Sequence, residues 1–418
     1  MKTFRTGVIG LGCRGAWWVE ELLSDLDYVC LTGLCDVYED RIEAAKEALV
    51  KKGRPAPAVL TGDYRALIDA PEVDVVLVFS AWANHVDAAL RAMRAGKPVA
   101  IEVGGAYSIE DCRALVRTQE QTGTPFMLLE NCCYGEYELM ALNMARHGLF
   151  GDIVHCDGGY LHDLRDEVSR GNETRHYRFL EYLNGNRENY PTHEIGPIAK
   201  LMRINNGNRF VSLVSVASRA AGLHEYVMAH EDLREKYADT VFRQGDIVKT
   251  LITCADGSTV AITLDTTLPR YYSRGLCVRG TGGFYEEATQ SVFLDGQDYG
   301  MAEWNWAPQF GNRKQYIDRW RHPIWKRYRG DGVKEQGHGG MDYLVIDAFF
   351  EALDKGLPMP IDVYDAASWM AISALSAESV AKGSQPVPFP DFTGGRWQIP
   401  RPEPDWKYRL EPDGAELP

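Results

Sequence analysis

The sequence predicts an α/β fold with a doubly wound parallel sheet at the N-terminus, followed by an α+β part with a large, mostly antiparallel open sheet. In the first third of the chain, short apolar strands alternate with helical stretches, as in a parallel sheet with crossover helices. After about Leu129 the strands become longer, and Ala255-Asp256-Gly257-Ser258 is a hairpin signal between two of them. The 418 residues are enough for two or three domains.

The N-terminal elements are expected to be short and regular. Val73–Phe79 is a β-branched run, typical of a strand that is buried on both faces. Ser108-Ile109-Glu110-Asp111 is a capping-box start, and Gly123 is expected to end the same helix. Further strands are expected at Phe4–Ile9, Tyr28–Cys35, Val99–Val103 and Phe126–Leu129, and further helices from Gly15 to Leu23 and at Glu39–Lys52.

The second part is expected to hold the longer strands, and its last third to hold two amphipathic helices. Strands are expected at 153–160, 210–217, 247–254, 259–266 and 275–279, and helices near 134–148, 195–203, 341–353 and 366–381. We expect domain boundaries after residues 130 and 383, with helices in 341–382 packing partly back on the first domain. The Pro-rich tail, 384–418, is expected to wrap the surface.

Charge and composition exclude several classes of protein. With 45 Lys and Arg against 59 Asp and Glu, the net charge of −14 argues against a nucleic-acid partner, because no excess of cations is available to displace counterions. The basic, aromatic stretch Arg313–Arg329 is therefore expected to be a surface segment or a subunit contact. No run approaches the roughly 18 apolar residues of a membrane span, and the first residues lack the apolar region of a signal peptide. We expect a cytoplasmic chain with no membrane partner.

The cysteines and histidines do not form a recognisable metal or disulfide pattern. The nine cysteines are scattered, and none stands in a C-x-x-C pair. Reduced thiols and no bound metal are the expectation.

A glycine motif follows the first expected strand. Gly10, Gly12 and Gly15 have the G-x-G-x-x-G spacing, and Asp36 closes the next expected strand about 20 residues further on. This context is that of the Rossmann fold, in which the glycines let a pyrophosphate approach the helix N-terminus and the acid accepts hydrogen bonds from the ribose. A carboxylate at Asp36 repels a 2′-phosphate, so NAD is favoured over NADP, although Arg41 nearby argues the other way. Residues 1–130 are therefore predicted to be an NAD-binding Rossmann domain.

Two blocks carry a wider resemblance. Val78–His85 and Ala95–Glu102 resemble the glucose–fructose oxidoreductase and inositol dehydrogenase (Gfo/Idh/MocA) superfamily. That resemblance implies a C-terminal α+β domain, here 131–383, whose open sheet carries the substrate and often the oligomer contact. It thus implies a homo-oligomer formed through the C-terminal sheet.

Further blocks are similar to glycoside hydrolase family 109. They are found at Leu128–Tyr134, Gly158–Arg165, Asn189–His193, Leu264–Arg274 and Gly337–Asp342. The resemblance implies an NAD-dependent glycosidase that acts on a small-molecule glycoside, with α-N-acetylgalactosaminidase as the named activity of the family. It implies a route in which C3 of the sugar is oxidised, the C1 group is eliminated, water adds, and the hydride returns.

Site residues follow from the chemistry and from the resemblance together. Imidazole is suited to proton transfer near neutral pH, and His193 stands in the family block. Glu130 ends an expected strand at the carboxyl edge of the sheet, where ligands bind. The candidate catalytic residues are His193, Tyr190 and Tyr160, and the candidate substrate-binding residues are Glu130, Arg178 and Tyr272. The candidate cofactor-binding residues are Gly10, Gly12, Cys13, Arg14, Gly15, Asp36, Trp82, His85, Glu102 and Asn131.

The chain departs from both families at a few positions. Dehydrogenases of the superfamily carry Glu-Lys-Pro at 102–104, where this chain has Glu-Val-Gly, and an Asp where Asn189 stands. The glycosidase family carries Pro at position 104 and Gly at position 194, where this chain has Gly104 and Glu194. Two alternatives stay open: a pyranoside 3-dehydrogenase that releases the keto sugar, and a non-catalytic NAD-binding regulator.

Overall fold

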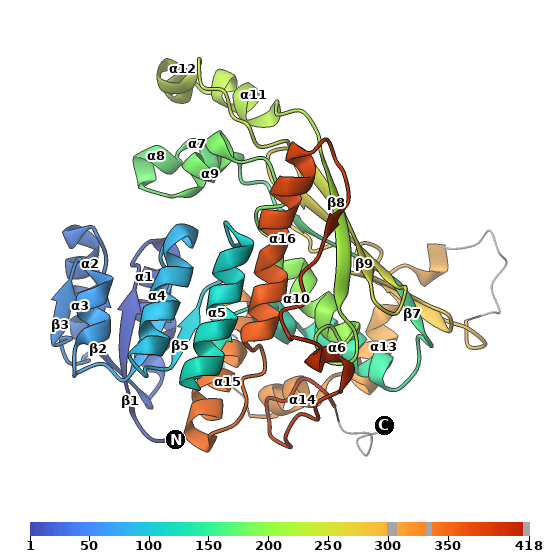
Figure 1. Ribbon diagram of the computed structural model, residues 1–418, viewed down its shortest axis with the longest axis horizontal. Helices are drawn as coiled ribbons and strands as arrows, with labels where there is room; N and C mark the ends of the chain where they lie inside the picture. Colours follow the sequence, from blue (N-terminus) through green and yellow to red (C-terminus); the bar gives the residue numbers. More distant parts are fainter. Residues whose placement is uncertain (299–306, 332–336, 413–418) are drawn as a thin grey trace. The chain divides into compact units, whose positions relative to one another are not determined.

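The computed structural model describes residues 1–298, 307–331 and 337–412. The chain divides into two compact units, Met1–Asn131 with Lys334–Ala367, and Cys132–Val333 with Ser368–Pro418. Figure 1 labels many of the helices and strands of each unit. The domain boundaries expected from the sequence stay predictions.

The first unit is built on a six-stranded parallel sheet. Its strands, in spatial order, are β3 (Val59–Thr61), β2 (Val29–Cys35), β1 (Phe4–Ile9), β4 (Val75–Val78), β5 (Val99–Ile101) and β6 (Phe126–Leu128). All four residues of β4 are buried, as expected for a β-branched strand inside a parallel sheet. The strand order reverses between β1 and β4, and ligands bind outside the carboxyl ends of the strands at such a point. The predicted doubly wound fold is confirmed.

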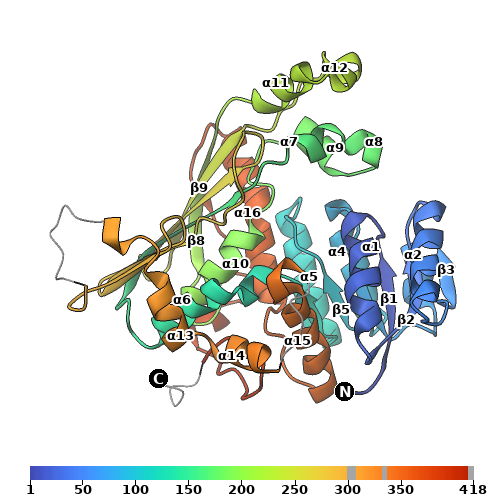
Figure 2. The same cartoon turned by 180° about the vertical axis from the view of Figure 1, so that it is seen from behind.

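Helices cover this sheet on both faces, as the two opposite views show (Figures 1 and 2). The capping box is confirmed, since Ser108 Oγ accepts a hydrogen bond from the Asp111 N–H at 3.1 Å and the Asp111 carboxylate accepts one from the Ser108 N–H. Gly123 ends that helix with a φ of +65°. The helices of the first unit include α1 (Cys13–Trp17), α2 (Glu39–Lys51), α3 (Tyr64–Asp69), α4 (Trp82–Arg94), α5 (Ile109–Thr122) and α15 (Met341–Lys355).

The second unit is built on an eight-stranded sheet. Its spatial order is β13 (Ser291–Leu294), β12 (Gly283–Glu286), β11 (Cys277–Gly280), β7 (Ile153–Leu161), β10 (Thr259–Asp265), β9 (Ile247–Cys254), β8 (Phe210–Ala217) and β14 (Val387–Pro388). The sheet is mostly antiparallel, as predicted, and β7 and β10 form its parallel pair. The predicted hairpin is confirmed, because β9 and β10 pair antiparallel around the turn at 255–258.

One face of this sheet is covered by α10 (Thr192–Leu201), which lies against β7. The helix comes so close that a Cβ on Gly158 would lie 2.9 Å from both Glu194 Cβ and Ile198 Cδ1. On the strands that follow, apolar side chains alternate with exposed ones, and Val216 and Leu251 are about half exposed. The end of β7 and the start of α10 are therefore held close together by this packing.

The 13-residue helix α4 was not expected from the sequence, and neither were several short elements. The short ones are β3, β12, β13 and β14, together with α3, α7 (Arg165–Ser169), α8 (Gly171–Thr174), α9 (Arg178–Asn184), α11 (Gly222–Ala229), α12 (Glu231–Tyr237), α13 (Arg313–Trp320) and α14 (Pro323–Gly330). Such elements are too short to show a periodic pattern of their own. The remaining helices of the second unit are α6 (Glu136–Arg146) and α16 (Val363–Ala381), the latter beginning in the first unit.

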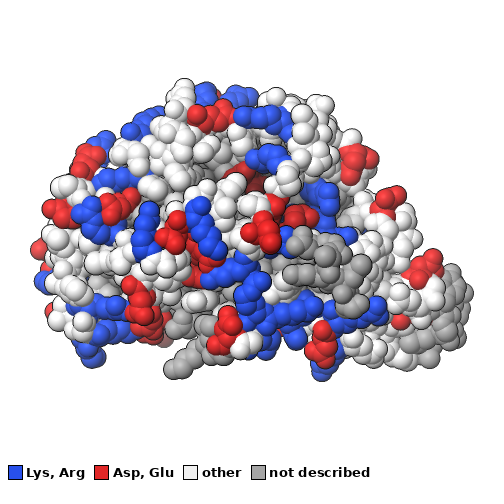
Figure 3. All heavy atoms as spheres, turned by 90° about the horizontal axis from the view of Figure 1, so that it is seen from below, with Lys and Arg blue, Asp and Glu red and all other residues white. Residues whose placement is uncertain are grey.

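The basic stretch 313–329 forms α13 and most of α14, and part of its charge is paired. Arg321 and Arg329 both bind the Glu136 carboxylate, at 2.7 Å each. On the face drawn in Figure 3, basic and acidic side chains are interspersed. In the part of the chain that the structure describes, no helix is long and apolar enough to span a bilayer.

Candidate active site

The glycine motif forms a tight turn between β1 and α1. Gly10 has a φ of +91°, and a Cβ there would lie 2.4 Å from the Ser80 nitrogen. A Cβ on Gly15 would lie 1.9 Å from the Gly10 carbonyl oxygen. A Cβ on Gly12 would meet a single neighbour, Arg41 Nη1 at 3.6 Å, so the turn is open at this position. The turn is thus packed against protein at its ends and open in the middle, which fits a pyrophosphate approaching the backbone.

Asp36 lies beside this turn, at the end of β2. Its Oδ2 accepts a hydrogen bond from the Leu11 N–H at 2.7 Å, and its Oδ1 accepts one from the Tyr38 N–H at 3.0 Å. The Arg41 guanidinium lies 3.8 Å from Oδ2. The carboxylate is therefore held where a ribose of a bound dinucleotide is recognised.

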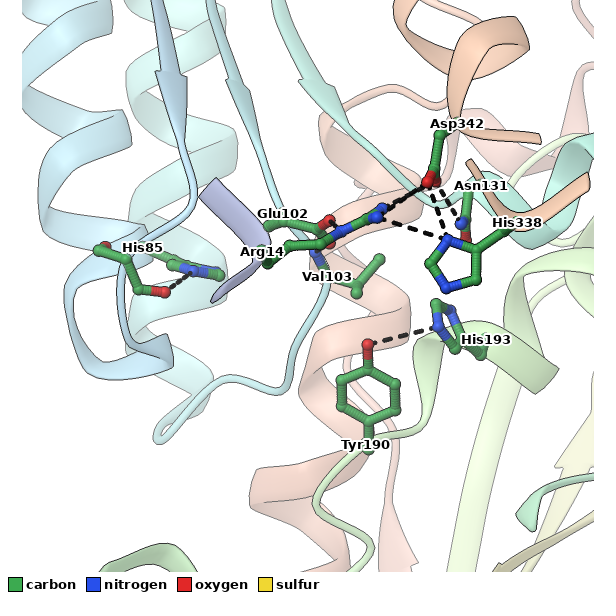
Figure 4. A network of polar contacts seen from close by, with 10 residues as sticks. Arg14, His85, Glu102, Val103, Asn131, Tyr190, His193, His338 and Asp342 are labelled. Carbon is green, nitrogen blue, oxygen red and sulfur yellow. Dashed lines mark hydrogen bonds and ion pairs between the residues drawn. The ribbon is translucent and has the colours of Figure 1, made fainter. Parts of the chain in front are cut away.

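Arg14, inside the glycine motif, is held by two carboxylates of the first unit (Figure 4). Its Nε donates to Glu102 at 2.6 Å, and its two terminal nitrogens donate to Asp342 at 2.8 and 2.7 Å. Asp342 is fully buried and also accepts a hydrogen bond from Asn131 Nδ2 at 2.7 Å, while His338 Nδ1 lies 2.8 Å from its other oxygen. Burial alone would raise the pKa of Asp342, but the hydrogen bonds from Arg14 and His338 outweigh it and hold that pKa well below its usual range.

This network fixes the glycine turn from outside the motif. Asp342 and His338 come from the second segment of the unit, more than 300 residues further along the chain. Because the guanidinium of Arg14 is planar and forked, it can bind both carboxylates at once. The direct cofactor contact expected for Arg14 stays a prediction.

Position 104 explains one departure from the family pattern. Gly104 has a φ of +157°, and a Cβ there would lie 2.5 Å from Trp82 Cδ1. Proline cannot adopt this φ. Glycine at 104 therefore lets the Trp82 ring pack against the backbone, which a family-type Pro would prevent in this conformation.

His85 and Cys13 differ in their environments. His85 Nε2 lies 2.8 Å from the Ser80 carbonyl oxygen, and burial lowers the pKa of the ring, so His85 is neutral at pH 7. Cys13 is exposed at the start of α1. For the ten candidate cofactor-binding residues, contact with the cofactor stays a prediction.

The candidate catalytic residues form a cluster of aromatic and imidazole rings in the second unit. Tyr160 lies near the end of β7, Tyr190 lies two residues before α10, and His193 lies in the first turn of α10. The hydroxyl of Tyr190 lies 3.4 Å from His193 Nε2 (Figure 4). The ring centroid of Tyr160 is 4.3 Å from that of Tyr190 and 5.7 Å from that of His193. The structure therefore brings together the three residues that the sequence predicted separately.

A second phenol–imidazole pair adjoins the first. The hydroxyl of Tyr160 lies 3.1 Å from His162 Nδ1. Burial, and then the charge of Arg178, lowers the pKa of His162, so this ring is neutral at pH 7 and can exchange a proton with the phenol. Burial also raises the pKa of Tyr160 above its ordinary value, so Tyr160 remains a phenol. Together, Tyr160, His162, Tyr190, His193 and Tyr272 are called the ring cluster below.

Arg178 and Tyr272 are the predicted substrate-binding residues of this unit; Arg178 borders the ring cluster, and Tyr272 is its most exposed member. The Arg178 guanidinium lies 5.1 Å from the ring centroid of Tyr190 and 6.0 Å from that of Tyr160, and its Nη1 donates to Glu167 at 3.0 Å. Tyr272 packs edge to face on His162 at 5.1 Å and is 45% exposed. A buried cation and an exposed phenol therefore flank the two phenol–imidazole pairs. Glu130, the third predicted substrate residue, follows β6 in the first unit and is fully buried; its role stays a prediction.

Both parts of the chain match known protein families. Residues 4–129 match the oxidoreductase family with an NAD-binding Rossmann fold, and residues 134–399 match the C-terminal domain of glycosyl hydrolase 109. The chain belongs to glycosyl hydrolase family 109. A family 109 protein of Stenotrophomonas maltophilia is 38% identical over 96% of this chain and 91% of its own length. The alpha-N-acetylgalactosaminidase of Tannerella forsythia is 37% identical over 94% of this chain and 87% of its own length.

Solved structures that this family 109 chain resembles share its fold at low sequence identity. Levoglucosan dehydrogenase in complex with NADH has a TM-score of 0.65 at 19% identity, covering 92% of this chain and 99% of its own. An apo scyllo-inositol dehydrogenase of Lactobacillus casei has a TM-score of 0.64 at 15% identity, covering 93% of this chain and 98% of its own. The predicted family, fold and NAD cofactor are confirmed, and the chain is an NAD-dependent enzyme of a glycosidase family.

The sequence did not predict the residues that hold Tyr272 in place in this family 109 site. Arg274 donates from Nη1 to the Tyr272 hydroxyl at 3.4 Å and from Nε to Glu138 at 2.7 Å. Arg274 stood at the end of a family block, but Glu138 is 136 residues away on α6, so no local pattern links them. Glu188, fully buried two residues before Tyr190, was also missed.

Proposed function

We propose that this enzyme cleaves N-acetylhexosaminides, such as α-linked N-acetylgalactosamine, through a transient oxidation of the sugar ring. The observation that carries the proposal is the pair of neighbouring phenol–imidazole contacts, Tyr190 with His193 and Tyr160 with His162, in a chain that also has an NAD turn. Relatives named alpha-N-acetylgalactosaminidase, 37% and 35% identical, support the substrate class.

The chemistry needs two separate proton transfers on the sugar. NAD, when bound, supplies a hydride acceptor for C3 and returns the hydride at the end of the cycle. While C3 is a ketone, the C2 proton is acidic, so a base can remove it and the C1–oxygen bond breaks with loss of the alcohol. Water then adds at C1 and a proton returns to C2, so the sum is hydrolysis. The C3 hydroxyl must also lose its proton during oxidation and regain it later.

The ring cluster is suited to these transfers. Each pair joins a phenol, which can hold or give a proton, to an imidazole, which can exchange one near neutral pH. The pairs are adjacent, because the rings of Tyr160 and Tyr190 are 4.3 Å apart. We assign the proton transfer at the C3 hydroxyl to one of these pairs and the removal of the C2 proton to the other.

Arg178 is suited to stabilise the negative charge that develops on the sugar. Removing the C2 proton beside a ketone places negative charge on the C3 oxygen, and a fixed cation in a buried site stabilises such an oxyanion. Arg178 is 8% exposed and lies over the rings of both catalytic tyrosines.

The alternative is a sugar 3-dehydrogenase that releases the oxidised sugar, and the dehydrogenase structures with the same fold favour it. Against it, the segment Glu102-Val103-Gly104 lacks the lysine that such dehydrogenases carry, and Asn189 replaces their aspartate.

Purified protein with NAD and chromogenic glycosides separates the two functions. We expect release of the aglycone from an N-acetylhexosaminide with no accumulation of NADH. Stoichiometric NADH without aglycone release would establish the dehydrogenase, and equal rates on the plain hexoside would contradict the N-acetyl substrate class.

Tyr272 and Arg274 are expected to act together in substrate binding. Because the phenol accepts a hydrogen bond from Arg274, its own proton is directed to an acceptor oxygen on the substrate. Tyr272→Phe and Arg274→Lys should each raise KM about tenfold, the value of one hydrogen bond of about 1.4 kcal/mol, with little change in kcat. Lysine keeps a cation for Glu138, and Arg279→Lys, at an exposed position of β11, is the matched control. Additive effects in the double variant would show that the two residues act independently.

A further inference from the structure

The segment that leads into α10 is irregular yet buried. Residues 185–191 form neither helix nor strand, and residues 188–192 are all buried. Buried backbone N–H and C=O groups need hydrogen-bond partners, which regular structure does not supply here. Side chains must therefore hold this segment in place.

Three side chains do so. The Glu188 N–H donates to Ser376 Oγ on α16 at 2.8 Å. The Tyr190 N–H donates to Glu188 Oε1 at 3.2 Å. Gln244 binds Arg187 through both the N–H, at 3.2 Å, and the carbonyl oxygen, at 3.0 Å. Glu188 thus stands between the anchor on α16 and the backbone of the catalytic tyrosine.

A carboxyl group is energetically unfavourable at this buried position. Glu188 is fully buried, and its Oε2 has no hydrogen-bond partner among the described residues. Burial raises the pKa of Glu188 to about 8, so the group is mostly protonated at neutral pH. A buried polar atom without a partner destabilises the folded state. An unfavourable buried carboxyl two residues before Tyr190 indicates that Glu188 has a role in the Tyr190–His193 pair.

We propose that Glu188 is a positioning residue that fixes the backbone of Tyr190 and thereby aims the Tyr190 hydroxyl at His193. The proposal rests on the proposed function of this pair. The hydroxyl lies 3.4 Å from His193 Nε2, at the long end of a hydrogen bond, so a small displacement of the Tyr190 backbone breaks the contact. A misplacement of about 1 Å in a catalytic site can cost about 10²-fold in rate.

The test compares two replacements of similar size. Glu188→Gln keeps an uncharged acceptor for the Tyr190 N–H, and Glu188→Met fills the same space without one. With a chromogenic N-acetylhexosaminide, we expect the glutamine variant to keep kcat within about threefold of the original, and the methionine variant to lose about 10–100-fold in kcat with little change in KM. Ser379→Ala, which removes a buried serine of the same helix whose Oγ accepts a hydrogen bond from the Ser215 N–H instead, controls for a loss of stability alone.

A second readout does not depend on activity. The ring protons of His193, assigned by their absence in His193→Ala, should shift in the NMR spectrum of Glu188→Met and stay in place in Glu188→Gln. If the methionine variant does not fold, Glu188→Ala takes its place. Unmoved His193 signals in a variant without the acceptor, or equal losses of kcat in the glutamine and methionine variants, would overturn the proposal. Shifted signals in an enzyme that cleaves no glycoside would uphold the positioning role and refute the proposed function instead.

Discussion

Replacing His193 with alanine is expected to lower kcat/KM by about 10²–10⁴-fold, the usual contribution of a positioned acid or base. His193 Nε2 is the atom that can exchange a proton with the Tyr190 hydroxyl, at 3.4 Å, and its ring packs on Tyr190 and Tyr160. Tyr190→Phe should cause a loss of similar size. The two losses should not add in the double variant, because either change destroys the same pair. Steady-state kinetics on a chromogenic glycoside measures the effect.

The control for this prediction is His224→Ala, since His224 is an exposed imidazole on α11. It should leave kcat/KM and thermal stability unchanged. A His193→Ala protein that is folded and nearly as active as the original would remove this residue from the mechanism.

Replacing Asp342 with alanine is expected to destabilise the cofactor unit by about 3 kcal/mol, because it removes the fully buried carboxylate of this ion pair and leaves Arg14 to pair with the carboxylate of Glu102. The glycine turn that carries Arg14 should then be less well ordered, and NAD should bind more weakly. Chemical denaturation and a titration with NAD measure the two effects. Asp354→Ala, an exposed change on the same helix, should alter neither.

The same aspartate predicts a dependence of stability on pH. Because folding lowers the pKa of Asp342, its stabilising effect is complete above the ordinary carboxyl pKa of about 4 and is lost as the pH falls further toward the lower, folded-state value. Asp342→Asn should therefore lose less stability than the original protein between about pH 5 and pH 3. Equal losses in the two proteins would contradict the assignment.

Features that depend on residues close together in the sequence could be predicted from the sequence alone. Gly10, Gly12, Gly15 and Asp36 form a local motif with fixed spacing, and the long strands β8 and β9 show clear β-branched runs. The predicted bounds of these two strands are confirmed. The block that ends at His193 was recognisable because five consecutive residues, Asn189–His193, carry it.

Contacts between distant residues could not be predicted in the same way. Asp342 binds Arg14 across 328 positions, and Glu138 binds Arg274 across 136. The burial of Glu188 is a tertiary property too, since it depends on α16 lying against the segment before α10. Short strands such as β12 and β13 owe their pairing to their neighbours rather than to their own sequence, and were missed for that reason.

The fate of the proton on C2 of the sugar tests the redox-elimination route most directly. If C2 loses its proton to a base of the enzyme and regains one when water adds at C1, sugar released in heavy water must carry deuterium at C2. A direct displacement by two carboxylates would leave that position untouched. The measurement is the proton NMR spectrum of the sugar released by turnover in heavy water, with the same sugar incubated with His193→Ala as the control. We predict loss of the C2 proton signal in the product of the active enzyme; a fully protonated C2 would contradict the route, even if the enzyme hydrolyses the glycoside.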